Sequence, residues 1–90
     1  MQHPNVAAQA GTLESSDILV MIEPVEAGAG RHIDLESNVM TQYGERIREQ
    51  VIHVLDAMSV TDVHILVKDK GALDATIQAR VETALKRSLY

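Results

Sequence analysis

The sequence predicts an α/β (α+β) fold, a single two-layer sandwich of the order β-β-α-β-α, with two helices covering one face of a small mixed sheet. Apolar residues alternate with a period of two in two short stretches and form a short continuous run in a third, and both patterns are typical of strands. In two longer stretches they recur every three to four residues, which is typical of amphipathic helices. The chain has 90 residues, enough for one domain with one modest core.

The first two predicted strands are residues 17–23 and 32–36, joined by a glycine-containing segment, residues 27–30. The first is apolar on both faces, which is typical of a strand inside a sheet or of one covered by a partner. Its apolar residues are Ile18, Val20 and Ile22 on one face and Leu19 and Met21 on the other. We expect the two strands to form a hairpin. A further short strand is expected around residues 12–14.

The first predicted helix follows, because the apolar spacing becomes helical from residue 39 onward. Its apolar positions are Val39, Tyr43, Ile47, Val51, Leu55 and Met58. Gly44 does not suit a helix interior, where it costs about 1 kcal/mol relative to alanine. Close packing of the helix against the sheet would explain it.

Residues 62–68 form the clearest predicted strand, and a second amphipathic helix follows the segment Asp69–Asp74. The strand alternates apolar and polar residues apart from Leu66 on the outer face. The apolar positions of the helix are Leu73, Ile77, Val81, Ala84 or Leu85, and Leu89. Because a helix links residues 32–36 to residues 62–68, we expect these two strands to run parallel. Asp69 or Gly71 is expected to cap the second helix.

The composition excludes several classes of function. The chain lacks cysteine, which excludes disulfides, thiolate catalysis and cysteine-based zinc sites. The net charge of −5, with the acidic residues scattered, argues against a nucleic acid partner. No apolar run approaches the ~18 residues of a membrane span. We therefore expect a cytoplasmic protein with a flexible N-terminus, residues 1–9, and one domain, residues 10–90.

The most informative segment is Gly11-Thr12-Leu13-Glu14-Ser15-Ser16-Asp17, which places two hydroxyls between two carboxylates. Taken alone, it predicts a polar turn that satisfies its own backbone groups. Serine catalysis would need a base oriented by a third group, and no such motif surrounds any histidine. The four histidines also lack the spacing of metal ligands. They are His3, His32, His53 and His64. We expect no catalytic residues and no metal site.

This segment resembles the Gly-Thr-Leu-Glu-Ser-Gly-Asp motif of the citrate lyase acyl carrier protein (gamma chain) family. Three further segments resemble the same family in the same order and spacing. They are Tyr43-Gly44-Glu45-Arg46-Ile47-Arg48, Asp69-Lys70-Gly71-Ala72-Leu73-Asp74 and Ala79-Arg80-Val81-Glu82. The resemblance runs from about Ala10 to the C-terminus.

The resemblance implies a non-catalytic carrier, in which Ser15 holds a 2′-(5″-phosphoribosyl)-3′-dephospho-CoA group through a phosphodiester. The terminal thiol of that group would carry acetyl and then citryl as thioesters. The implied partners are a coenzyme-transfer enzyme and the alpha and beta subunits of citrate lyase, which cleaves citrate to oxaloacetate and acetate. Where the family motif has glycine after the serine, this chain has Ser16, so Ser16 is a second, less favoured attachment point.

Two other functions are compatible with the sequence. One is the related carrier subunit of malonate decarboxylase, which uses the same coenzyme. The other is a small regulatory or adaptor α/β domain without a covalent group. The apolar residues Leu19, Met21 and Leu66 are either a docking surface or covered by a second layer. The segment Asp69–Asp74 is expected to form the turn between strand and helix, and contact with the coenzyme is an open alternative.

Overall fold

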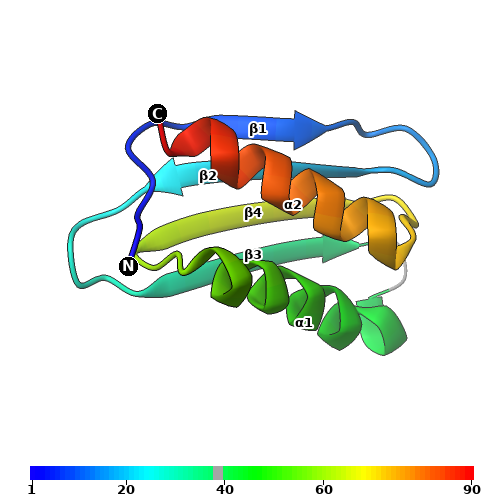
Figure 1. Ribbon diagram of the computed structural model, residues 1–90. Helices are drawn as coiled ribbons and strands as arrows, with labels where there is room; N and C mark the ends of the chain where they lie inside the picture. Colours follow the sequence, from blue (N-terminus) through cyan, green and yellow to red (C-terminus); the bar gives the residue numbers. More distant parts are fainter. Residues whose placement is uncertain (38–39) are drawn as a thin grey trace.

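The computed structural model describes residues 1–37 and 40–90. Its elements are β1 (Ala8–Gly11), β2 (Ile18–Pro24), β3 (Arg31–Ser37), α1 (Met40–Met58), β4 (Val63–Asp69) and α2 (Asp74–Ser88). The strands form one sheet in the order β1-β2-β4-β3, in which β3 and β4 are parallel and the other neighbours antiparallel. Both helices lie on the same face of this sheet (Figure 1). The predicted two-layer sandwich with a mixed sheet is confirmed.

The arrangement of the strands differs from the prediction in two respects. The expected extra strand exists, but it lies at Ala8–Gly11, and residues 12–17 form the loop after it. The predicted hairpin between β2 and β3 is wrong, because β4 lies between them. Alternation identifies each strand but not its neighbours. The inward residues of β4 are completely buried, which places this strand inside the sheet.

The core lies between the sheet and the helices and is aliphatic. Residues aligned across the strands, such as Ile22, Ile65 and Ile33, supply its lower layer. The helices add an upper layer of buried residues, Ile47, Val51, Val54, Leu55, Ile77, Val81, Ala84 and Leu85. The predicted core positions Val39 and Tyr43 lie outside the residues whose side chains the structure describes.

Leu73 does not belong to this core, in contrast to the prediction. It precedes α2 with an extended backbone (φ −74°, ψ 157°) and is 76% exposed. Helical spacing places residues four apart on one face only where the backbone between them is helical. Leu73 and Ile77 are therefore four residues apart in the sequence without lying on one face of α2.

The N-terminal residues are held by backbone hydrogen bonds. The amide of Gln2 donates to the carbonyl of Ser59, and the amides of Asn5 and Val6 donate to that of Ser88. Ala8 and Gln9 belong to β1. The division into a flexible segment (residues 1–9) and a domain (residues 10–90) stays a prediction. Among the described residues, no helix combines the length and apolar character needed to cross a bilayer.

Replacing Gly44 with alanine is expected to stabilise the protein. A Cβ atom built at Gly44 lies 3.7 Å from the Leu35 side chain, which is an ordinary contact, so close packing does not explain the glycine. Alanine reduces the conformational entropy of the unfolded chain and favours α1, and we expect a gain of about 1 kcal/mol. Urea unfolding of Gly44→Ala and of the unmodified sequence measures this difference in the free energy of unfolding. A loss of stability would contradict this account of the contact.

Candidate functional site

The two candidate serines lie in the loop between β1 and β2, at the opposite end of the molecule from both termini (Figure 1). The amide of Asp17 donates to the carbonyl of Glu14 (3.2 Å), which makes Ser15 and Ser16 the central residues of a four-residue turn. Both are exposed. Within the part of the chain that the structure describes, no group hydrogen-bonds to the Ser15 hydroxyl. The turn therefore presents this hydroxyl to solvent.

The turn is fixed to the end of β4 by a β-bulge. The amide of Ser16 donates to the carbonyl of Lys70 (2.8 Å), and the amide of Lys70 donates to the carbonyl of Asp17 (2.9 Å). Ser16 and Asp17 on one side of the bulge thus face Lys70 alone on the other. The first of the two, Ser16, has a left-handed backbone with φ 65°. This kind of bulge favours glycine at its first position. The resembling family motif has glycine there, and the structure supplies the physical reason.

Replacing Ser16 with glycine is expected to stabilise the protein. A non-glycine residue in the left-handed region costs about 1–2 kcal/mol, and part of this gain is lost to the greater freedom of glycine in the unfolded chain, so we expect a net gain of about 1 kcal/mol. Urea unfolding measures it. The matched control is Ser15→Gly, because Ser15 has no positive φ and glycine there should lower the stability slightly. Equal effects of the two substitutions would contradict the account.

The side chain of Asp17 holds the loop together and connects it to α2. Its carboxylate accepts hydrogen bonds from the Thr12 hydroxyl (2.7 Å) and from the amide of Ile18 (2.7 Å). It also pairs with the guanidinium of Arg80 in α2, at 3.2 Å from Nε and 3.3 Å from Nη2. The Thr12 hydroxyl in turn accepts from the amide of Glu14 (3.2 Å). The pKa of Asp17 lies below its ordinary value of 3.8, because the bonds from Thr12, then Ile18 and Arg80, favour the charged form.

The lowered pKa of Asp17 predicts a specific loss of stability in acid. A carboxyl group with a lowered pKa stabilises the fold above its ordinary pKa of 3.8, and this contribution disappears as the pH falls through the folded-state value. Thermal unfolding between pH 5 and the acid limit should therefore show a smaller acid-dependent loss for Asp17→Asn than for the unmodified sequence. Thr12→Ala removes the largest cause of the shift and should give an intermediate slope. Identical slopes in all three proteins would contradict the prediction.

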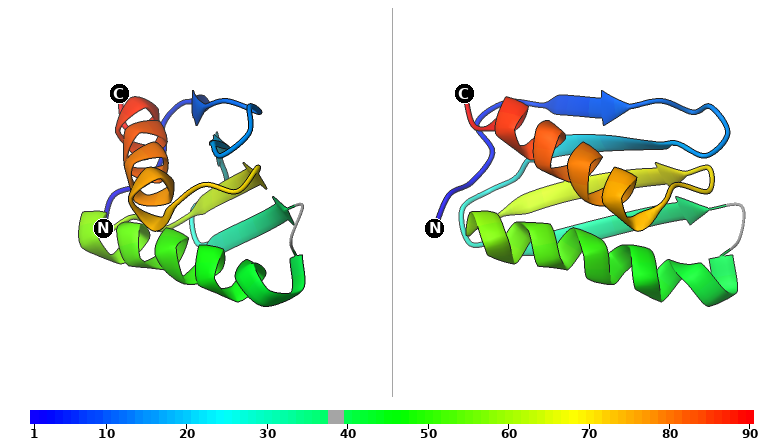
Figure 2. Two further views of the ribbon diagram at one scale, coloured as in Figure 1. Left: turned by 90° about the vertical axis from the view of Figure 1, so that its right-hand side faces the viewer. Right: turned by 45° about the vertical axis from the view of Figure 1, so that its right-hand side comes forward.

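Three of the four segments that carry the family resemblance lie at or near this end of the molecule, which faces the viewer in Figure 2 (left), and the fourth lies midway along α2. They are residues 11–17, 43–48, 69–74 and 79–82. Arg80 joins the last segment to Asp17 in the first. Arg46 in α1 joins the second to Asp74 in the third, with Nε 3.1 Å from both carboxylate oxygens and Nη2 2.5 Å from one of them. The first and third are joined at Lys70. Sequence reasoning missed these charged pairs, because the partners of each pair lie far apart along the chain.

The turn between β4 and α2 is organised by Asp69, whose side chain is buried. Its carboxylate accepts hydrogen bonds from the amides of Gly71 (3.1 Å) and Ala72 (3.0 Å) and from the Ser37 hydroxyl (3.1 Å). It therefore holds the turn before the helix, as predicted for the segment Asp69–Asp74. The prediction that Asp69 or Gly71 caps α2 is wrong, because the capping position is Leu73 and no side chain caps the helix there.

The face of the sheet opposite the helices carries Leu19, Met21 and Leu66, all half-buried. Met21 and Leu66 lie side by side on β2 and β4. Within residues 1–37 and 40–90, no helix covers this face (Figure 2). The role of these residues as a docking surface stays a prediction.

Comparison with known proteins gives matches over almost the whole chain. The family model described as the acyl carrier protein "malonate decarboxylase delta subunit (MdcD)" matches residues 5–88. The citrate lyase acyl carrier protein of Vibrio cholerae serotype O1 (strain M66-2) is 51% identical over 86 residues, covering 96% of this chain and 84% of the relative. That of Edwardsiella ictaluri (strain 93-146) is 45% identical over 84 residues, covering 93% and 85%.

A solved structure shares the fold. A chain in the crystal structure of a Pseudomonas malonate decarboxylase hetero-tetramer in complex with malonate superposes with a TM-score of 0.78 at 21% identity. The match covers 96% of this chain and 88% of the other. The arrangement of sheet and helices is thus one that a subunit of a multi-chain enzyme also has.

Proposed function

This chain belongs to the family of citrate lyase acyl carrier proteins, and we propose that it carries a 2′-(5″-phosphoribosyl)-3′-dephospho-CoA group on Ser15. The observation that carries the proposal is the exposed Ser15 hydroxyl on a turn fixed from several sides. The bulge with Lys70 holds the turn to β4, and the pair of Asp17 with Arg80 holds it to α2. Two of the other segments of family resemblance thus support the turn, through Lys70 and Arg80.

The residues of the loop fit the proposed group. A phosphodiester needs a primary hydroxyl that a transfer enzyme can reach, and the exposed Ser15 meets this requirement. When bound, the group supplies a terminal thiol for carrying acyl chains as thioesters. The protein itself holds the attachment point in one orientation, because Asp17 and the bulge fix both ends of the turn. No catalytic group is needed for this role.

We assign the chain a non-catalytic place in a citrate lyase complex in the cytoplasm. The carrier presents acetyl and citryl groups to the alpha and beta subunits, and citrate is cleaved to oxaloacetate and acetate. The support for this assignment is the similarity to citrate lyase acyl carrier proteins at 45–51% identity.

Intact-mass measurement tests the proposal. The chain is produced with and without a coenzyme-transfer enzyme of citrate lyase and its coenzyme precursor. We expect a mass increase of one phosphoribosyl-dephospho-CoA unit only in the presence of the enzyme, in the unmodified sequence and in Ser16→Ala. The absence of any adduct under conditions that load a citrate lyase carrier from a relative would overturn the proposal.

The carrier subunit of malonate decarboxylase is the second candidate, because the matching family model is described by that subunit and the fold is shared with a chain of that complex. The identity is 51% to a citrate lyase carrier against 21% to that chain, which favours citrate lyase. Reconstitution separates the two functions. The loaded chain should restore activity to citrate lyase subunits that lack their carrier, and restoration of malonate decarboxylase alone would favour the second candidate.

A further inference from the structure

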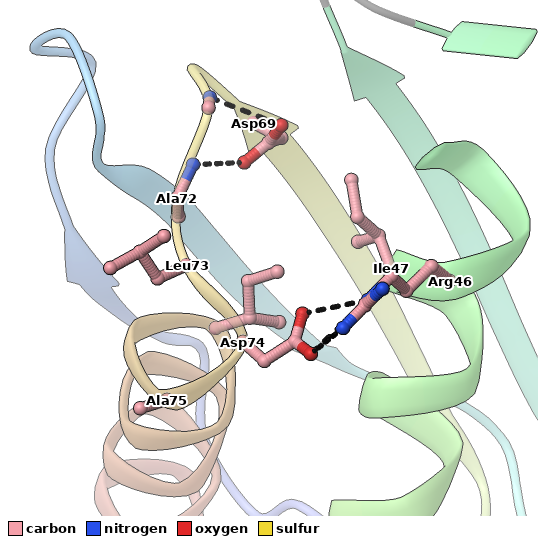
Figure 3. Close-up of a pocket in the computed structure, with 9 residues that line it drawn as sticks. Arg46, Ile47, Asp69, Ala72, Leu73, Asp74 and Ala75 are labelled. Carbon is pink, nitrogen blue, oxygen red and sulfur yellow. Dashed lines mark hydrogen bonds and ion pairs between the residues drawn. The ribbon is translucent and has the colours of Figure 1, made fainter. Parts of the chain in front are cut away.

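A groove of about 560 Å³ opens between α1, the β4–α2 turn and the first turn of α2 (Figure 3). Its volume lies within the roughly 300–1,000 Å³ of small-molecule sites. Its lining is mainly apolar and consists of Ile47, Ala72, Leu73, Ala75 and Ile77, with Gly71 and the polar residues Arg46, Asp69 and Asp74. The pair of Arg46 and Asp74 bridges α1 and α2 beside it. The buried core residues Ile47 and Ile77 form the bottom of this groove, and Ala72 and Leu73 stand at its side.

The groove lies close to Ser15. Lys70 is hydrogen-bonded to the serine turn on one side and is followed by Gly71 of the groove on the other. Two steps along the chain and one step across the bulge separate Ser15 from Gly71, which limits their Cα distance to about 13 Å. A group derived from coenzyme A is many bonds long and can span this distance. The path over Gly71 is open, because a Cβ atom built there would meet no atom within 4 Å.

Leu73 gives an independent indication that the groove binds a ligand. It occupies the capping position of α2, where serine, threonine, aspartate and asparagine are preferred by about 1 kcal/mol. The chain instead places there a leucine that is 76% exposed and lines the groove. A residue that both leaves the helix uncapped and exposes apolar surface is unfavourable for the free fold. It becomes favourable if an apolar chain covers it.

We propose that the coenzyme arm attached at Ser15 rests in this groove between its visits to the partner subunits. The inference depends on the function proposed above. The pantetheine end of the arm, which bears the thiol, consists largely of methylene and amide groups, and this part suits an apolar groove with a few polar groups at its edge. Leu73 and Ala72 contact the arm from the turn, and Ile47 and Ile77 form the buried floor. The groove thus keeps the thiol-bearing end of the arm near the protein.

Amide chemical shifts of the unloaded and loaded chain test the proposal, with intact mass confirming that the group is attached at Ser15. We expect shifts to change at residues 14–16 and also at a distal set, residues 46–47 and 71–77. Shift changes confined to the serine loop, in a sample whose mass proves loading, would overturn the proposal that the arm binds in the groove. They would leave the proposed carrier function intact. A sample that cannot be loaded would overturn both.

Leu73→Ser is the matching variant, because serine is a good capping residue and should stabilise α2 while it removes the apolar side chain. In the loaded form of this variant we expect loss of the distal shift changes, with those at residues 14–16 retained. The control is Ile52→Ser, which removes an exposed apolar side chain of α1 outside the groove. It should keep the distal set. Retention of that set in Leu73→Ser, or its loss in both variants, would contradict the proposal.

Discussion

Replacing Ser15 with alanine is expected to abolish covalent loading of the chain and to reduce the citrate lyase activity of the reconstituted complex to background. The physical reason is that a methyl group has no oxygen with which to form the phosphodiester. The fold should be unaffected, since Ser15 is exposed, and surface substitutions of this kind change stability by less than about 0.5 kcal/mol. Intact mass, activity and urea unfolding of the same sample measure all three quantities.

Ser16→Ala is the matched control for this prediction. It removes the neighbouring hydroxyl and keeps a non-glycine residue at φ 65°, so the strain in the turn should be similar. We expect this variant to be loaded and active. The opposite pattern, in which Ser15→Ala is loaded and Ser16→Ala is not, would move the attachment point by one residue.

Replacing Gly11 with alanine is expected to destabilise the protein by about 3 kcal/mol or more, a large part of the 5–15 kcal/mol typical of a domain. Gly11 ends β1 with φ 94°, and a Cβ atom built on it would lie 1.8 Å from the carbonyl oxygen of Ile18. Backbone atoms cannot move away from such a clash without separating β1 from β2. The serine loop would then lose its fixed geometry, so we also expect loading at Ser15 to be impaired.

Gly28→Ala and Gly30→Ala are controls that separate the clash from backbone strain. Both glycines have similar φ values, 86° and 83°, and a Cβ atom at either would meet nothing within 4 Å. The free energy of unfolding of these variants should fall only by the cost of a left-handed backbone at alanine, about 1–2 kcal/mol. Urea unfolding of the three variants gives the comparison. A Gly11→Ala protein as stable as the Gly30→Ala protein would show that the close approach to Ile18 is not required.

The sequence allowed most of the fold to be predicted, because apolar periodicity reports which face of each element is buried. It indicated β2, β3, β4 and both helices, and the linking helix correctly implied that β3 and β4 are parallel. The neighbours of β2 could not be inferred in this way, since any strand with a matching apolar face can pair with it. The same limit explains Leu73, whose spacing from Ile77 is helical in sequence but not in space.

The site was predictable only in part. The family resemblance identified Ser15, and the change from glycine to Ser16 was visible as a departure from the motif. The reason for that glycine was not visible, because it depends on a bulge with Lys70, far along the chain. The pairs of Asp17 with Arg80 and of Arg46 with Asp74 likewise depend on how the elements pack. Local sequence patterns hold no information on contacts of this range.

Fragmentation mass spectrometry of the loaded chain identifies directly the residue that carries the group. Cleavage after Glu14 and Glu23 releases residues 15–23, in which Ser15 and Ser16 are the only hydroxyl-bearing residues. Cleavage of the bond between them then assigns the group to one of the two. We predict that the whole phosphoribosyl-dephospho-CoA mass remains with Ser15. A group found on Ser16, or in any other part of the chain, would contradict the account.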